Sequence, residues 1–120
     1  MPEELLEVSM ARGDIHVIHF QVIDEETGML SDIPFDEIYM SVKKTVYDRD
    51  VLFQKKLTDG GIEKITDGDF QVRIDPVDTE NLDFRTYPFD IKVIYGNEIK
   101  KTYCGELEIT SVVTSKWNEV

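Results

Sequence analysis

The sequence predicts an all-β domain, an antiparallel sandwich of about seven strands with Greek-key-like connections. Three observations lead to this prediction. Apolar and polar residues alternate with a period of two along most of the chain, which is the pattern of half-buried strands. Short clusters of Asp, Gly and Asn separate these segments, as in tight turns. No segment has the spacing of a long crossover helix, so hairpins and loops are expected to join the strands.

The first half of the chain predicts four strands. Residues 14–23 form the first, in which one face carries His16, Ile18, Phe20 and Val22. The segment "FDEIYMSVKKTV", residues 35–46, contains the second, whose buried face carries Ile38, Met40 and Val42. The segment "YDRD" supplies a turn, so residues 51–57 are expected to return beside the second strand as a hairpin. A short fourth strand is expected around 62–65, between "TDGG" and "TDGD".

The second half predicts three strands and one helical turn. Residues 69–75 alternate in the same way and stop at Pro76, which cannot donate to a sheet. One turn of helix is expected near 77–82, where the chain crosses between the sheets; the residues assigned to it are Asp78 or Thr79 as caps and Leu82 as a core residue. Residues 86–96 and 97–110 then form a hairpin with Asn97 at its tip, and Gly105 indicates a bulge or a close backbone approach.

The domain is expected to span residues 12–114, with tails at 1–11 and 115–120, because these ends lack an obvious strand pattern. The stretch "LLEVSM" in the first tail is compatible with a short amphipathic segment. Trp117 in the second tail is a candidate for contact with a partner, and the alternative is packing against its own domain.

Composition restricts the partners and the compartment. The 120 residues suffice for one domain with a core. The net charge is -12 and no cluster of Lys or Arg interrupts it, so neither nucleic acid nor an anionic membrane is an expected partner. The single cysteine, Cys104, excludes an intramolecular disulfide. The first residues lack the features of a secretion signal and no long apolar run occurs, so we expect an intracellularly made, soluble protein.

The residue types that carry chemistry do not assemble into a site in the sequence. His16 and His19 are three positions apart on a predicted strand, so they point to opposite faces and cannot share a metal ion. Cys104 has no neighbouring His and is expected to be inert. The acidic turns, such as "TDGD", lack the spacing of a known calcium loop, and turn formation explains their Asp and Gly residues. We predict no catalytic residue, no metal ion and no cofactor.

Between residues 12 and 114 a set of motifs follows in a recognisable order: "RGD", "DGDFQVRI", "DPVDTENL", "YPFDIKV" and "CGELEITSVVT". This order resembles the small Ig-like β-sandwich modules of tailed-phage and prophage structural proteins, such as baseplate upper proteins and fibre or head-associated modules. The resemblance marks as structural positions Gly13, Asp14, Asp78, Thr79, Leu82, Tyr87, Asp90 and Gly105. Phe89 departs from the pattern, which has a second tyrosine there. Tyr87 is placed like a tyrosine corner, a buried ring whose hydroxyl bonds backbone near 78–82.

The resemblance implies a non-enzymatic virion protein of the baseplate, tail fibre or head, made in the cytoplasm of a bacterial host. Its partners would be other phage structural proteins, in a homo-oligomer or a co-assembly formed through sheet edges or tails. An alternative is a module that binds a cell-surface glycan or receptor, with Ca²⁺ at the acidic turns; the exposed aromatic candidates are Tyr39, Tyr47, Tyr95 and Trp117. A sandwich fold serves both roles and does not choose between them.

The tripeptide Arg12-Gly13-Asp14 also occurs in cell-adhesion ligands. Here Asp14 runs directly into the first predicted strand, which leaves little room for the exposed loop tip that adhesion requires. We therefore expect a lead-in to the sheet in which Gly13 supplies backbone freedom, Asp14 bonds a nearby N–H and Arg12 is a surface side chain.

Overall fold

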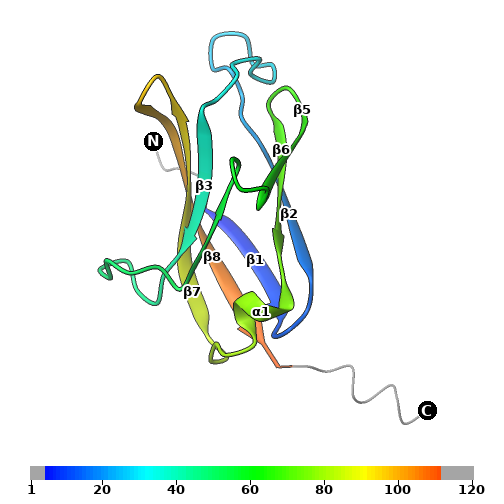
Figure 1. The fold of residues 1–120 in the computed structure, drawn as a ribbon, viewed down its shortest axis with the longest axis vertical. Helices are drawn as coiled ribbons and strands as arrows, with labels where there is room; N and C mark the ends of the chain where they lie inside the picture. The colour runs from blue at the N-terminus through cyan, green and yellow to red at the C-terminus, as the bar shows by residue number, and fades with distance from the viewer. Residues whose placement is uncertain (1–4, 112–120) are drawn as a thin grey trace, which may run out of the picture.

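A computed structural model describes residues 5–111, which form a sandwich of two β-sheets (Figure 1). The elements in chain order are β1 (Leu6–Ala11), β2 (His16–Gln21), β3 (Glu37–Val42), β4 (Phe53–Lys56), β5 (Ile62–Thr66), β6 (Asp69–Ile74), α1 (Pro76–Thr79), β7 (Thr86–Tyr95) and β8 (Glu98–Thr110). One sheet has the order β1-β8-β7-β3-β4 and the other β2-β6-β5. The predicted all-β sandwich is confirmed.

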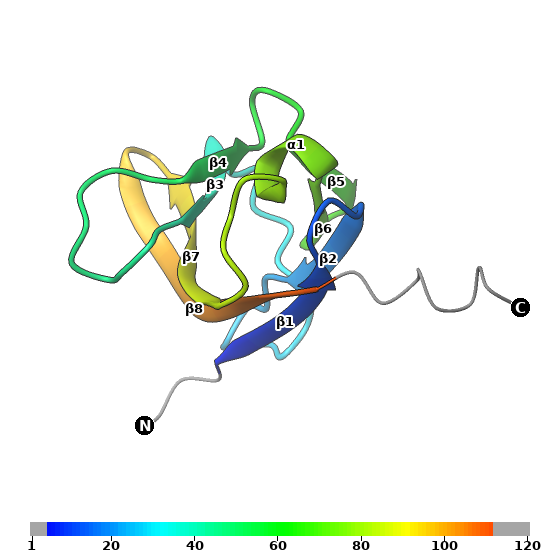
Figure 2. The ribbon, with the colours of Figure 1, turned by 90° about the horizontal axis from the view of Figure 1, so that it is seen from below.

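The hydrophobic core lies between the two sheets, which face each other in Figure 2. Alternate residues of each strand point into it, because a strand sends successive side chains to opposite faces. The most completely buried hydrophobic side chains are Ile38, Met40, Val42, Ile62, Phe70, Val72, Ile74, Ile91, Val93, Leu107 and Ile109. The faces predicted for β3 and β6 are therefore the buried ones.

The strand order is that of an Ig-like sandwich. The run β8-β7-β3-β4 corresponds to strands G, F, C and C′ of a variable-type Ig domain, and β2-β6-β5 corresponds to B, E and D. The expected hairpins β3–β4 and β7–β8 are present, and α1 lies where the chain passes from the three-stranded to the five-stranded sheet. Within residues 5–111, no helix is long and apolar enough to cross a membrane.

The first strand, β1, corrects the prediction of a tail at residues 1–11. Residues 6–11 pair with β8, in parallel and in unbroken register from Leu6 opposite Gly105 to Ala11 opposite Thr110. The described domain therefore has eight strands, and one strand pair departs from the expected antiparallel arrangement. Leu6, Val8 and Met10 do alternate with polar residues, but the partner that makes them a strand lies at the other end of the sequence.

Gly105 of β8 lies between Leu6 of β1 and Phe89 of β7, with which it pairs on either side. A Cβ atom added there would lie 2.2 Å from Cζ of Phe89 and 2.7 Å from the carbonyl oxygen of Leu6. Only a residue without a side chain fits this space. Of the two predicted explanations, the close approach is right, because the irregularity in the β7–β8 pair falls at Val93/Ile94 instead.

Candidate functional site

The turn between β1 and β2 contains the Arg-Gly-Asp tripeptide and packs against the α1 turn. The backbone N–H of Gly13 donates to the hydroxyl of Thr79, which is fully buried (2.9 Å). The Arg12 guanidinium donates to the carbonyl of Leu82 (3.2 Å) and lies 4.1 Å from the ring centre of Phe84. Arg12 is thus half-buried rather than a free surface side chain. Arg12 and Gly13 of the tripeptide join the β1–β2 turn to residues 79–84, so the tripeptide is not an exposed loop tip.

Tyr87 forms the expected tyrosine corner. Its ring is 3 % exposed, and its hydroxyl donates to the carbonyl of Asp83 (3.0 Å), just beyond the predicted stretch 78–82. Leu82 is partly buried and packs against the core, as predicted. Together, residues 12–13 and 75–87 form what we call the basal corner, at the lower end of the molecule in Figure 1.

The α1 turn of the basal corner is capped by carboxylates. Asp75 is its N-cap, and the carboxylate of Asp78 accepts the backbone N–H of Asp75 (2.8 Å), so Asp78 caps as expected and Thr79 does not. Lys55 of β4 bridges to Asp78 at 2.6 Å. The Arg73 guanidinium, 2.7 Å from Asp75, holds the pKa of the Asp75 carboxyl below its ordinary value, and Lys55 acts in the same direction.

Three other residues singled out in the sequence take no part in a chemical site. Asp14 is exposed and its backbone N–H donates to Ala11, while the described residues show no hydrogen bond of its carboxylate. Asp90 lies on the outer face of β7, opposite Cys104 of β8 and Ser41 of β3. Cys104 is exposed on that same face. In the described part of the chain, no three His, Cys, Asp or Glu residues are arranged to hold a metal ion.

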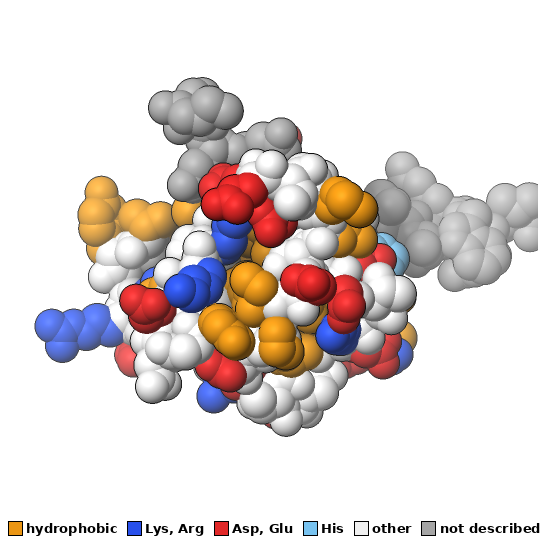
Figure 3. Space-filling view, turned by 90° about the horizontal axis from the view of Figure 1, so that it is seen from above, with side chains coloured by type: hydrophobic (Ala, Val, Ile, Leu, Met, Phe, Trp, Pro, Cys, Tyr) orange, Lys and Arg blue, Asp and Glu red, His pale blue; other side chains and the backbone are white. Residues whose placement is uncertain are grey.

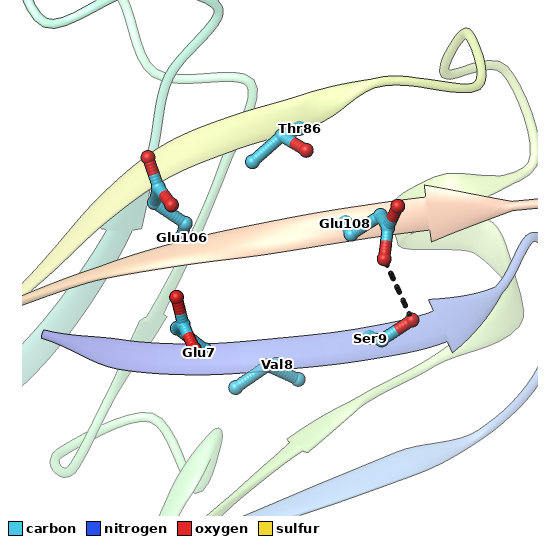
Figure 4. A pocket seen from close by; sticks show the side chains of 6 residues that line it. All are labelled: Glu7, Val8, Ser9, Thr86, Glu106 and Glu108. Atoms are coloured by element: carbon cyan, nitrogen blue, oxygen red, sulfur yellow. Dashed lines mark hydrogen bonds between the residues drawn. The ribbon is translucent and has the colours of Figure 1, made fainter.

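A shallow hollow of about 390 Å³ lies on the outer face of β1, β8 and β7 (Figure 4). Its lining residues are Glu7, Val8, Ser9, Thr86, Glu106 and Glu108. Glu7 stands beside Glu106, and Ser9 stands beside Glu108 and donates to it (3.2 Å). The hollow is acidic, and the sequence did not indicate it because its glutamates come from strands at opposite ends of the chain.

The upper end of the sandwich in Figure 1, here called the apical end, is built from three connections: 22–36, the β5–β6 turn and the β7–β8 turn. Hydrogen bonds join them, since Val22 donates to Gly68 (2.8 Å) and Gly96 donates to the carboxylate of Asp36 (2.6 Å). Figure 3 shows hydrophobic side chains gathered at the centre of this end. The exposed ones in the 22–36 connection and near the ends of β5 and β7, which we call the apical patch, are Met29 (70 %), Leu30 (38 %), Ile33 (38 %), Ile65 (46 %) and Tyr95 (39 %).

Carboxylates surround the apical patch. The lysines of this end are already neutralised by ion pairs: Lys64 with Asp67 (2.8 Å), Lys100 with Glu98 (3.0 Å) and Lys101 with Glu25 (3.3 Å). Three further exposed carboxylates, Glu26, Asp32 and Asp36, form no ion pair within residues 5–111. The rim of the apical patch is therefore negatively charged.

A second exposed apolar surface is the connection between β3 and β4, residues 43–52, here called the protruding loop. Figures 1 and 2 show it extending away from both sheets. Its exposed hydrophobic side chains are Val46 (67 %), Tyr47 (92 %), Val51 (40 %) and Leu52 (41 %). A turn orders its tip, because Thr45 donates to the carboxylate of Asp48 (3.1 Å). Its cations, Lys43, Lys44 and Arg49, form no ion pair with any described residue.

The sequence indicated some of these surface residues and missed others. The predicted aromatic candidates are spread apart: Tyr39 on β3, Tyr47 on the protruding loop and Tyr95 at the apical end. Trp117 lies outside the described residues. The sequence does not predict the exposure of the apolar residues of "GMLSDIPF", since Met29 and Ile33 are exposed while Phe35 of the same segment packs against the core. The chain matches no protein-family model, and no curated protein matches it.

Proposed function

We propose that this chain is a non-enzymatic structural module of a tailed-phage or prophage virion, which acts through contacts with other proteins. One observation carries the protein-contact role. Among residues 5–111, nine of the fifteen exposed large hydrophobic side chains belong to the apical patch and the protruding loop. Apolar side chains gathered on a soluble surface are typical of protein interfaces. The resemblance of residues 12–114 to phage modules supplies the virion as the setting.

In this function the basal corner stabilises the domain and does not contact a partner. Its polar groups are occupied within the domain, by the bonds of Gly13 to Thr79 and Tyr87 to Asp83. No substrate turnover and no cofactor is assigned to the chain. The module is made in the bacterial cytoplasm and then resides in the particle, where its partners are other phage structural proteins, further copies of itself included.

Mass spectrometry of purified particles tests this function. The particles should be induced from the host strain, banded on a density gradient and compared with the unbanded lysate. We expect peptides of this chain to be enriched in the particle band in proportion to known virion proteins. A chain that is abundant in the lysate and missing from the band would contradict the proposal.

The hollow on the outer face favours a second candidate, a glycan-binding module. Its carboxylates and the hydroxyls of Ser9 and Thr86 are groups that can bond sugar hydroxyls, and the outer face leaves them accessible. A thermal-shift titration with a glycan panel, with and without Ca²⁺, checks this candidate. A rise in the melting temperature that is lost in Glu106→Gln would support it, and no rise with any glycan or with Ca²⁺ would count against it.

A further inference from the structure

The apical patch and the protruding loop cannot cover each other within one molecule. Strand β3 separates them, because it follows the apical connection 22–36 and precedes the protruding loop 43–52. A strand of six residues spans roughly 20 Å at about 3.3 Å per residue. Within residues 5–111 both surfaces are therefore open to solvent, and each is available to another molecule.

The charges of the two surfaces decide which contact is favourable. Pairing two apical patches would bring Glu26, Asp32 and Asp36 against the same carboxylates of a second copy. Pairing two protruding loops would bring together two surfaces of the same net charge, because Lys43, Lys44 and Arg49 outnumber Asp48 and Asp50. Loop against patch joins surfaces of opposite net charge, with apolar side chains at the centre of both.

The shape of the loop supports the same pairing. Tyr47 is 92 % exposed at the end of a connection that stands away from the sheets. Tyrosine and arginine are enriched among the side chains that dominate binding energy at interfaces. A projecting Tyr47 with Arg49 two residues away fits an anchor that enters a neighbouring apolar surface.

We propose that the protruding loop of one copy docks on the apical patch of the next copy, in a head-to-tail contact. Tyr47 and Val46 lie against Met29 and Ile33 of the neighbour, and the loop cations face its acidic rim. Each copy uses two different surfaces, so the contact repeats and gives a ring where the rotation closes or a filament where it does not. This inference rests on the proposed function for its assembly role and names the partner of that function.

Sedimentation velocity of the full chain over a range of concentrations tests the contact. We expect the chain to self-associate as its concentration rises, at an ionic strength that screens the repulsion between copies of net charge -12. A loop variant, Lys44→Glu with Tyr47→Ser, and a patch variant, Met29→Ser with Asp32→Lys, should each weaken association by about tenfold or more. The matched control, Val17→Ser with Glu80→Lys, changes the same kinds of residue on other faces and should associate like the parent.

Mixing the two variants gives the most specific result. The loop variant keeps an intact patch and the patch variant an intact loop, so a mixture should form one-to-one dimers and nothing larger. A parent chain that stays monomeric, or variants that fail to complement each other, would overturn the head-to-tail contact. If the loop variant alone still associates, the contact does not need the protruding loop and the inference is wrong. A monomeric chain found in purified particles would remove this inference while the proposed function stands.

Discussion

The basal corner and the apical end close the same sandwich in opposite ways. At the basal corner, the N–H of Gly13, the hydroxyl of Tyr87 and the carboxylate of Asp78 all bond groups of the same domain. At the apical end, large apolar side chains such as Met29 stay exposed inside a negatively charged rim. The difference teaches that the polar bonds at one end stabilise the domain, while the other end leaves apolar side chains in contact with solvent.

The largest expected effect on stability comes from substituting Gly105. Its lack of a side chain lets β1 pack beside β8 just before the chain enters the basal corner. Gly105→Ala puts a methyl group against the Phe89 ring and should lower the free energy of unfolding by about 3 kcal/mol. Urea unfolding followed by circular dichroism measures this. In a Phe89→Leu background the same substitution should cost less, because the clashing ring atoms are gone. An equal cost in both backgrounds would remove the Phe89 contact as the cause.

A smaller loss is expected from Thr79→Val, which keeps the shape of the buried side chain and leaves the N–H of Gly13 unpaired. The free energy of unfolding should fall by about 1 to 2 kcal/mol. Thr102→Val, on the exposed side of β8, is the matched control and should change little. If both substitutions cost the same, the bond between Gly13 and Thr79 contributes nothing to the basal corner.

The basal corner should also respond to acid. Because folding lowers the pKa of Asp75, its contribution to stability is present above the ordinary value of 3.8 and is lost as the pH falls through the folded value. Stability should therefore decline below about pH 4 less steeply in Asp75→Asn than in the parent. Melting temperatures across this range measure the slope, with Glu106→Gln as a control for the loss of one negative charge. Parallel curves for the parent and Asp75→Asn would contradict the prediction.

The smallest change in stability is expected at the apical patch. Met29→Ser should alter the free energy of unfolding by no more than about 0.5 kcal/mol, since the side chain is 70 % exposed. The same unfolding experiment provides the comparison with Thr79→Val. A loss as large as that of Thr79→Val would mean that the patch is part of the packing, and the contrast between the two ends would disappear.

Local patterns predicted most of the fold. The faces of β3 and β6, the hairpin tip at Asn97, and the corner at Tyr87 depend on neighbours within a few residues, so alternation and turn chemistry are sufficient. Strand β1 was missed because its pairing depends on a partner that no local pattern reveals. Arg12 was misjudged for the same reason, since its contact with Leu82 joins residues 70 apart. The apical patch is not predicted, because its residues come from one connection and from the ends of β5 and β7, which meet only in the folded chain.

Strand β1 has a consequence for synthesis on the ribosome. Its partner positions on β8 follow 99 residues later, as for Ser9 and Glu108. At about 5 to 20 residues per second, β1 leaves the ribosome roughly 5 to 20 seconds before the strand that receives it. During this interval Leu6, Val8 and Met10 have no sheet to join, so the first strand to be made is the last to be incorporated. A chain stalled before Glu98 would present this strand to chaperones.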